Sequence, residues 1–257
     1  MKEDINSIYE FVNEKIKIER REKDYNLFKV ENDVFDRKTM LSLYELLKHN
    51  YFDIIEFPIK IGKEANIFRA KKGRKYLAVK IYRTSTKNFN TIINYIEGDY
   101  RFQNIKRSTL GIIYLWAQKE YRNLTDCFDA GVLVPKPVVF LKNIVVMEYL
   151  GTSKFPSPLL KDYTVEIEKL YPVILENLMK MVNVANLVHG DLSEYNIVVH
   201  KNKPYIIDVS QAMPVKHPNA RLLLERDIKN MVRFFRKKGI NANEKDFYDK
   251  IDWGVFI

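Results

Sequence analysis

The order in which helical and strand-like patterns follow one another constrains the fold of this chain more than any other feature of its sequence. Residues 1–50 are charged and helical in pattern, with an apolar stripe that starts after Asp36, a predicted helix N-cap. Short apolar runs separated by Gly62 and Gly73 follow over residues 52–82 and indicate strands and hairpin turns. Because these patterns are segregated along the chain, we expect an α+β fold and not a parallel βαβ array.

Patterns beyond residue 82 predict a variable segment and then mostly helices. Residues 83–108 are rich in Arg, Lys, Asn, Ser and Thr, so we expect a mobile functional segment with room for a short helix near Ile92–Ile96. Helices are predicted over 109–126, 163–186 and 219–238, the second kinked at Pro172 and the third ended by Gly239. Strands are predicted in a hairpin over 132–150 and at 197–200 and 205–207. The sequence thus divides into a helical extension (1–50), a strand-rich part (51–148) and a helix-rich part (149–257).

The chain is basic, with 43 Lys and Arg against 33 Asp and Glu and a formal net charge of +10. Such an excess favours polyanionic partners, such as nucleic acid, or phosphate-bearing ligands. A solubilising surface explains the charge equally well. The basic residues cluster at two places, Lys71–Lys75 in a predicted turn and Arg233–Lys238 at a predicted helix end, where cations also favour the helix dipole.

The sequence disfavours disulfide-rich, cysteine-zinc, membrane-spanning and secreted proteins. Cys127 is the single cysteine, which excludes an internal disulfide framework and a cysteine-rich zinc site. No apolar run approaches the roughly 20 residues that span a bilayer, and residues 1–5 lack the apolar stretch of a signal peptide. We therefore expect a cytoplasmic protein without a membrane partner.

One polar segment has the spacing of a kinase catalytic loop. In His189–Asn196, which follows a predicted long helix, Asp191 precedes Asn196 by five positions. In that pattern the Asp orients or deprotonates the attacking hydroxyl and the Asn holds magnesium. Asp208 ends the next short strand and matches the position of a metal-binding carboxylate. The alternatives are a polar turn at His189–Asn196 and a strand cap at Asp208.

Further upstream, a lysine and a glutamate match the pair that holds nucleotide phosphates in kinases. Lys80 ends a predicted strand in the pattern Ala-x-Lys, and Glu120 lies on the helix that follows the variable segment. Gly62 and Lys63 lie between two earlier strands, where a glycine lets the backbone approach phosphates. A surface lysine and an ordinary turn are the alternatives when each is taken alone.

The apolar strand that ends at Met147 is followed by a predicted connection between the two parts. Glu148 and Leu150 lie there, and their backbones could bond adenine, with Met147 lining the pocket behind. Taken in order along the chain, these positions together predict an ATP-dependent phosphotransferase.

The motifs at residues 62–66, 187–196 and 207–211, the last followed by His217-Pro218, together resemble the RIO family of atypical protein kinases, in particular the subfamily without a winged helix, over about Phe35 to Phe235. In place of the Ser-Thr that usually precedes the loop glycine in that family, this chain has Lys60-Ile61, which removes hydroxyl groups from the loop. The resemblance rests on Gly-Lys-Glu-Ala-Asn at 62–66, Leu-Val-His-Gly-Asp-Leu-Ser-Glu-Tyr-Asn at 187–196 and Ile-Asp-Val-Ser-Gln at 207–211 followed by His217-Pro218.

The resemblance implies a two-lobed, protein-kinase-like fold that uses ATP and Mg²⁺, or Mn²⁺ in its place. It implies a nucleotide-binding lobe over 51–148 and a truncated catalytic lobe over 149–257. Apart from the resemblance, the 49 residues after Asp208 leave no room for a long activation segment. The resemblance also implies a serine/threonine kinase or ATPase that acts in maturation of the small ribosomal subunit, with pre-ribosomal RNA and proteins as partners. Asp208 is then either a metal ligand or a transient phosphate acceptor.

Three alternatives stay open from the sequence. Autophosphorylation could use the hydroxyls at 85, 86, 108 or 109 of the variable segment. A small-molecule kinase shares the His-Gly-Asp-Leu loop but usually has a larger helical part after it. A ribosome-binding module that uses ATP as a structural ligand would need no turnover, although Asp191, Asn196 and Asp208 are all present.

Overall fold

A computed structural model describes residues 4–16, 35–85, 89–102 and 108–256 of the protein. The chain divides into two compact units. The first unit takes in Met1–Ile93, Asn104–Tyr121 and Pro137–Tyr149, and the second takes in Asn94–Gln103, Arg122–Lys136 and Leu150–Ile257. The functional division into extension, nucleotide-binding part and catalytic part stays a prediction.

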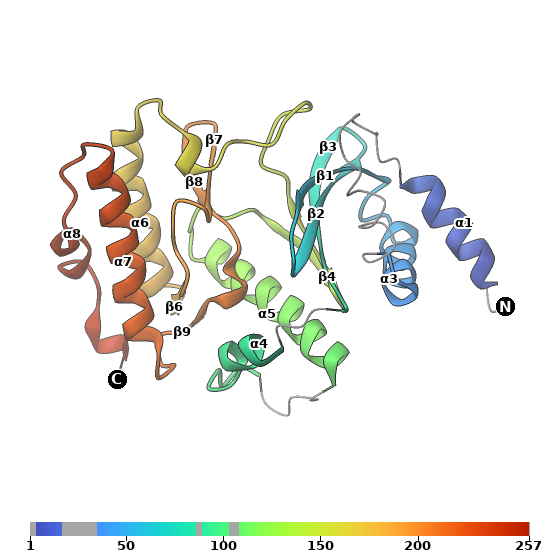
Figure 1. The fold of residues 1–257 in the computed structure, drawn as a ribbon, viewed down its shortest axis with the longest axis horizontal. Coiled ribbons are helices and arrows are strands. Elements are labelled where there is room, and N and C mark those ends of the chain that lie inside the picture. Colours follow the sequence, from blue (N-terminus) through green and yellow to red (C-terminus); the bar gives the residue numbers. More distant parts are fainter. Residues whose placement is uncertain (1–3, 17–34, 86–88, 103–107, 257) are drawn as a thin grey trace. The chain divides into compact units, whose positions relative to one another are not determined.

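The first unit is built on a five-stranded antiparallel sheet with the strand order β1-β2-β3-β5-β4 (Figure 1). Its strands are β1 (Ile54–Ile61), β2 (Ala65–Lys72), β3 (Lys75–Tyr82), β4 (Pro137–Leu141) and β5 (Ile144–Glu148). Gly73 has φ +55° in the β2–β3 turn, a conformation that favours glycine, and it confirms the predicted hairpin. Pro58 lies at a register shift of β1, an edge strand, where the missing N–H costs little.

Two helices precede the sheet in the chain, α1 (Ile5–Lys15) and α3 (Arg37–Lys48), and they pack against each other beside it (Figure 1). The carboxylate of Asp36 accepts the Thr39 N–H at 2.7 Å, which confirms Asp36 as the N-cap of α3. Buried apolar residues of both helices, among them Val12 and Leu43, form one core with Phe68 and other residues of the sheet. The predicted helical extension is therefore part of the folded first unit in the described residues.

A buried asparagine fixes the end of β3, the strand that carries Lys80. The Asn143 Nδ2 donates to Thr39 Oγ1 at 2.9 Å and to the Tyr82 carbonyl at 2.8 Å. Asn143 is fully buried, so both bonds lie in a low-dielectric interior where losing one is costly. The β4–β5 turn thus joins α3 to the last residue of β3.

The second unit is mostly helical, with two small antiparallel sheets. Its helices are α6 (Leu170–Asn183), α7 (Ala220–Lys237) and α8 (Glu244–Tyr248), with 3₁₀ turns η1 (Leu160–Asp162), η2 (Ile167–Lys169), η3 (Val209–Gln211) and η4 (Trp253–Phe256). One small sheet pairs β6 (Leu187–Val188) with β9 (Met213–Pro214), and the other pairs β7 (Ile197–His200) with β8 (Lys203–Ile206). The strand β6 ends just before residues 189–196 and β7 begins just after them, so each end of this stretch is anchored in a different small sheet.

The variable segment contains the predicted short helix, α4 (Phe89–Ile96), and α5 (Thr109–Asp129) follows it. The predicted mobility of residues 83–108 concerns in part residues 86–88 and 103–107, which lie outside the described residues. A fold with antiparallel sheets and separate helices confirms the expected α+β class.

The predicted kinked helix over 163–186 is wrong at its start. The helix α6 begins at Leu170, so Pro172 lies in its first turn, where an N–H has no intrahelical partner and proline is tolerated. The preceding residues form the 3₁₀ turn η2, which Glu166 enters with φ +46°. The stop of α7 is as predicted, because Gly239 follows Lys237 and Lys238 with φ +80°.

Among the residues that the structure describes, no helix combines the length and the apolar character needed to cross a bilayer.

Candidate functional site

A buried ion pair in the first unit joins Lys80 to Glu120. Lys80 is the sixth residue of β3, between Ile67 of β2 and Val145 of β5, so its side chain starts inside the sheet. Its Nζ lies 2.6 Å from Oε1 of Glu120 on α5, and the two side chains are 7% and 3% exposed. An isolated buried ammonium is costly, so the carboxylate is what permits a cation at this place.

Tyr82 contacts both members of this pair, a contact that the sequence did not indicate. Its hydroxyl donates to Oε2 of Glu120 at 2.5 Å, and the Lys80 Nζ lies 5.0 Å from the centre of its ring. Residues 80 and 82 of a strand lie on the same face, so the alternation of β3 brings both to Glu120.

The turn between β1 and β2 contains Gly62 and Lys63. The Gly62 N–H donates to Oδ1 of Asn66 at 3.0 Å. A Cβ added to Gly62 would lie 2.8 Å from the Ala65 carbonyl oxygen, so the turn is too tight for a larger residue. Lys63 is exposed on this turn.

Asn66 leaves a donor in this turn without a partner. Because its Oδ1 accepts the Gly62 N–H, its Nδ2 is fixed as the other end of the amide, and this buried atom has no hydrogen-bond partner among the described residues. A buried unpaired donor is costly, and a phosphate oxygen is an acceptor that would satisfy it. The chemistry of this turn therefore fits a phosphate-bearing ligand.

Met147 and Glu148 end β5, and Leu150 follows at the start of the second unit. Met147 pairs with Ala78 of β3 and Glu148 with Leu77, and both side chains are half-buried. The Leu150 carbonyl accepts the Ser157 N–H at 3.0 Å.

His189 fixes the start of the loop 189–196 in the second unit. Its ring is fully buried, and its Nδ1 accepts the Asp191 N–H at 3.2 Å, so its Nε2 carries the proton and donates to the Ile207 carbonyl at 3.2 Å. Burial lowers the pKa of His189, which keeps the ring neutral. The Asn196 carbonyl accepts the Ile207 N–H at 2.9 Å. The loop is thereby joined at both ends to the residue that precedes Asp208.

Asp227 of α7 holds the middle of the same loop, and the sequence did not single it out. Its Oδ2 accepts the Gly190 N–H and its Oδ1 the Leu192 N–H, each at 2.8 Å. Burial raises the pKa of Asp227 to about 7, although both N–H groups act in the opposite direction. Two neighbours on α7 bind carbonyls of the loop: Arg226 donates to Gly190, and Asn230 donates to Leu192 at 3.2 Å. The only sign of Asp227 in the sequence is an acid on the apolar stripe of the predicted helix, which does not reveal its partners.

The fixed loop presents Asp191 to solvent. The Asp191 side chain is exposed, while the residues on either side of it, Gly190 and Leu192, are buried. The Nδ2 of Asn196 donates to the Asp191 carbonyl at 2.9 Å and lies 3.4 Å from Oδ2 of the Asp191 carboxylate. The structure thus brings Asp191 and Asn196 together, as their spacing predicted.

Asp208 lies on a strained turn at the end of β8. It has φ +60° and ψ +54°, in the left-handed region that few residues other than glycine adopt, and it precedes the 3₁₀ turn η3. The Ser210 hydroxyl donates to its Oδ1 at 3.1 Å. Asn123 on α5 holds η3 from the other side, because its Nδ2 donates to the Val209 and Ala212 carbonyls at 2.7 and 2.8 Å.

The donor set of the second unit fits magnesium better than a transition metal. No group of three or more His, Cys, Asp or Glu side chains close enough to hold a metal occurs in the described part of the chain. Magnesium needs no such cage, because it takes one or two carboxylates and completes its shell with water and substrate phosphates. Asp208, with a hard carboxylate, and Asn196, with an amide oxygen, are ligands of that kind.

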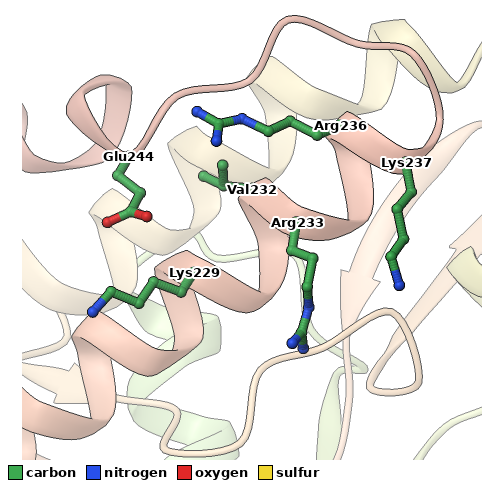
Figure 2. A pocket seen from close by; sticks show the side chains of 6 residues that line it. All are labelled: Lys229, Val232, Arg233, Arg236, Lys237 and Glu244. Atoms are coloured by element: carbon green, nitrogen blue, oxygen red, sulfur yellow. The ribbon is translucent and has the colours of Figure 1, made fainter.

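A basic groove lies along α7, and one of its cations, Arg233, donates to Asn230 at 2.9 Å. It is a hollow of about 380 Å³ lined by Lys229, Val232, Arg233, Arg236 and Lys237 of α7 and Glu244 of α8. Figure 2 shows that its cations spread along the helix and do not converge on one point, with Arg233 and Lys237 on one side and Arg236 on the other. The four cations are exposed, and none forms an ion pair with an acid in the described residues.

Comparison with known proteins places the chain among one family of kinases. A family model described as the RIO domain matches residues 66–248. The RIO-type serine/threonine-protein kinase Rio1 of Haloferax volcanii is 40% identical over 230 residues, which cover 89% of this chain and 79% of the relative. The protein of the same name from Methanocaldococcus jannaschii is 40% identical over 235 residues, or 91% and 81%. That from Thermoplasma acidophilum is 45% identical over 177 residues, or 69% and 94%.

Solved structures agree on the fold. A crystal structure of the Rio2 kinase from Chaetomium thermophilum, described as an ADP/Mg²⁺-phosphoaspartate complex, has a TM-score of 0.62 and 22% identity over 84% of this chain and 67% of that chain. A second crystal structure of that kinase has a TM-score of 0.63. These matches confirm the expected protein-kinase-like fold.

Proposed function

Because the chain belongs to the RIO family, we propose that it is an atypical serine/threonine protein kinase that transfers the γ-phosphate of ATP with magnesium. The observation that carries this proposal is the Lys80–Glu120 pair, in which a sheet buries an ammonium at the cost of burying a carboxylate beside it. A lysine that served only as a surface charge would need no buried carboxylate beside it. A buried, oriented ammonium is expected where a polyphosphate must be bound.

Residues of the first unit would bind the phosphates of ATP. Lys80 would contact the α- and β-phosphates, with Glu120 holding the ammonium in place. The turn with Gly62 and Lys63 would cradle the phosphates, and its support is the unpaired Asn66 donor.

Adenine would be bound by the backbone of the connection between the units. Glu148 would offer its carbonyl and Leu150 its N–H, while Met147 would line the pocket behind the base.

Phosphate transfer falls to residues of the second unit. Asp191 would accept a hydrogen bond from the substrate hydroxyl and take its proton as the oxygen attacks the γ-phosphorus and ADP leaves. Asn196 and Asp208 would hold magnesium, which supplies positive charge that neutralises the phosphates when bound. The exposure of Asp191 on a loop fixed by His189 and Asp227 supports its role, because a base must reach substrate without moving.

ATPase activity follows if a carboxylate accepts the phosphate in place of a substrate hydroxyl. An oxygen of Asp208 would attack the γ-phosphorus, ADP would leave, and water would then hydrolyse the acyl phosphate to aspartate and phosphate. The phosphoaspartate in the complex described for the Rio2 kinase supports this route.

The proposal is tested by incubating the protein with Mg²⁺ and γ-labelled ATP. We expect label on serine or threonine, or released as phosphate, and a loss of at least about 100-fold in Asp191→Ala at nearly unchanged ATP affinity. Asp249→Ala, which removes an exposed carboxylate on the same unit, serves as the control. Equal turnover in Asp191→Ala and the control would overturn the assignment of Asp191.

We further propose that the protein acts on pre-small-ribosomal particles, where RNA is the abundant polyanion. The basic groove on α7 supports this, because its cations are spread as an extended chain of phosphates requires, and a net charge of +10 draws such a partner. Cations near a helix C-terminus also stabilise the helix dipole, but Lys229 and Arg233 lie more than a turn ahead of Lys237.

Binding of a labelled single-stranded RNA, followed by fluorescence anisotropy at several salt concentrations, tests the groove. Arg233→Ala/Lys237→Ala should weaken binding and make the slope of log K against log salt shallower by about 1.4, because each phosphate that is no longer neutralised accounts for about 0.7. Lys201→Ala/Lys203→Ala removes the same charge from two exposed positions of the β7–β8 hairpin and should leave the slope unchanged. Equal slopes for the two double variants would exclude the groove as the RNA-binding surface.

A further inference from the structure

Tyr82 is the third member of the buried cluster formed by Lys80 and Glu120. Its hydroxyl lies 2.5 Å from one carboxylate oxygen of Glu120, while the Lys80 Nζ lies 2.6 Å from the other. The same ammonium lies 5.0 Å from the centre of the Tyr82 ring. All three residues are at most 6% exposed, so the contacts form inside the first unit.

This closed arrangement restricts the carboxylate more than an ion pair does. A carboxylate bound through one oxygen can rotate about its last bond, whereas donors on both oxygens fix its plane. The hydrogen bond from the Tyr82 hydroxyl also stabilises part of the negative charge of Glu120. The carboxylate therefore attracts the Lys80 ammonium less strongly than it would without this bond. The main chain of Tyr82 is itself fixed, because its carbonyl accepts from the buried Asn143.

We propose that Tyr82 is a positioning residue for phosphate binding: it orients Glu120 so that the Lys80 ammonium is presented to the nucleotide. The inference rests on the proposed function, since it gives the Lys80–Glu120 pair a purpose. It predicts an effect on ligands that carry phosphates and none on adenosine, because the proposed Lys80 contact is with phosphates alone.

The test compares the affinities of ATP, ADP and adenosine for wild type and Tyr82→Phe by titration calorimetry. The phenylalanine keeps the ring next to Lys80 and removes the hydroxyl. We expect the Kd of ATP and ADP to rise about five- to tenfold, the net effect of one ordinary hydrogen bond, and that of adenosine to change less than about twofold. At saturating ATP the kcat should stay within about twofold, because the contact acts in ground and transition states alike.

Two further variants separate positioning from a general loss of structure. Tyr76→Phe removes a hydroxyl from the same strand, where the ring packs against Arg69, and should leave all three affinities unchanged. In a Glu120→Gln background, Tyr82→Phe should have little further effect on ATP affinity, because the residue through which it acts is already altered.

The outcomes distinguish this inference from the proposed function. An equal loss of ATP and adenosine affinity in Tyr82→Phe, or an undiminished effect in the Glu120→Gln background, would overturn the positioning role. A wild-type protein that binds ATP no better than adenosine would instead overturn the proposed phosphate site itself. Thermal melts of each variant show whether it is folded at the temperature of the titration.

Discussion

Replacing Asp227 by asparagine should change how the stability of the second unit depends on pH. The carboxylate is fully buried and accepts the N–H groups of Gly190 and Leu192. Burial raises its pKa to about 7 from an ordinary value of 3.8. Because the folded state holds the proton more tightly than the unfolded state, the stability from this group is present below pH 4 and is lost as the pH rises to about 7.

The magnitude follows from the size of this shift. About three pKa units at about 1.4 kcal/mol each give a loss on the order of 4 kcal/mol between pH 4 and pH 8, as an upper limit. Asparagine cannot ionise, but its NH₂ replaces one acceptor oxygen and leaves one buried N–H unpaired, which costs about 2 kcal/mol at any pH. Asp227→Asn should therefore be less stable than wild type at pH 4 and as stable or more stable at pH 8.

Urea denaturation at several pH values measures this difference. Trp253 lies in the second unit and Trp116 in the first, so Trp253 fluorescence in a Trp116→Phe background follows the second unit. Glu225→Gln, an equivalent change on α7, controls for the loss of a carboxylate. A stability difference between Asp227→Asn and its parent that stays constant from pH 4 to pH 8 would refute the reasoning. Turnover should fall at all pH values, because the loop of Asp191 loses an anchor.

Three further predictions concern the first unit. Lys80→Met should destabilise the protein by about 3–5 kcal/mol in urea melts, because it leaves the buried Glu120 carboxylate without its cation. Lys80→Met/Glu120→Leu/Tyr82→Phe, which also removes the hydroxyl that donates to Glu120, should recover most of that loss without recovering ATP binding. Gly62→Ala should weaken ATP binding while adenosine affinity stays unchanged, because its Cβ would meet the Ala65 carbonyl oxygen at 2.8 Å; unchanged ATP titrations would contradict this. Asp36→Ala should lower the free energy of unfolding by about 1 kcal/mol through loss of the α3 cap, and Asp36→Asn should restore it in the same melts.

The sequence predicted those parts of the fold that local patterns determine. Asp36 caps the start of α3, Gly239 stops α7 and Gly73 forms a tight turn. Each does so through the chemistry of its own residue type, so each could be recognised without knowledge of the fold. The start of α6 was missed because Ile167 continues the apolar spacing of the helix, although the backbone before Leu170 is a 3₁₀ turn. Apolar periodicity reports which side chains are buried and says little about which hydrogen bonds their backbone makes.

The candidate site divides in the same way. Lys80 and Asp191 stand in recognisable local motifs, so their positions could be predicted. Tyr82 and Asp227 could not, because each bonds to residues at least 35 positions away in the chain and no local pattern marks that contact. The sequence does not show which distant residue will bond to a given buried polar group.

Because Asp208 has a left-handed backbone, the residue that would be most stable at this position differs from the residue that the proposed function needs. A residue with a Cβ at φ +60° costs about 1 kcal/mol or more relative to glycine, so a glycine at this position would relax the turn. The same exchange would remove the carboxylate that this turn presents. Directed evolution that screens for thermal tolerance alone should therefore enrich Asp208→Gly, and a screen that also demands phosphate transfer should eliminate it.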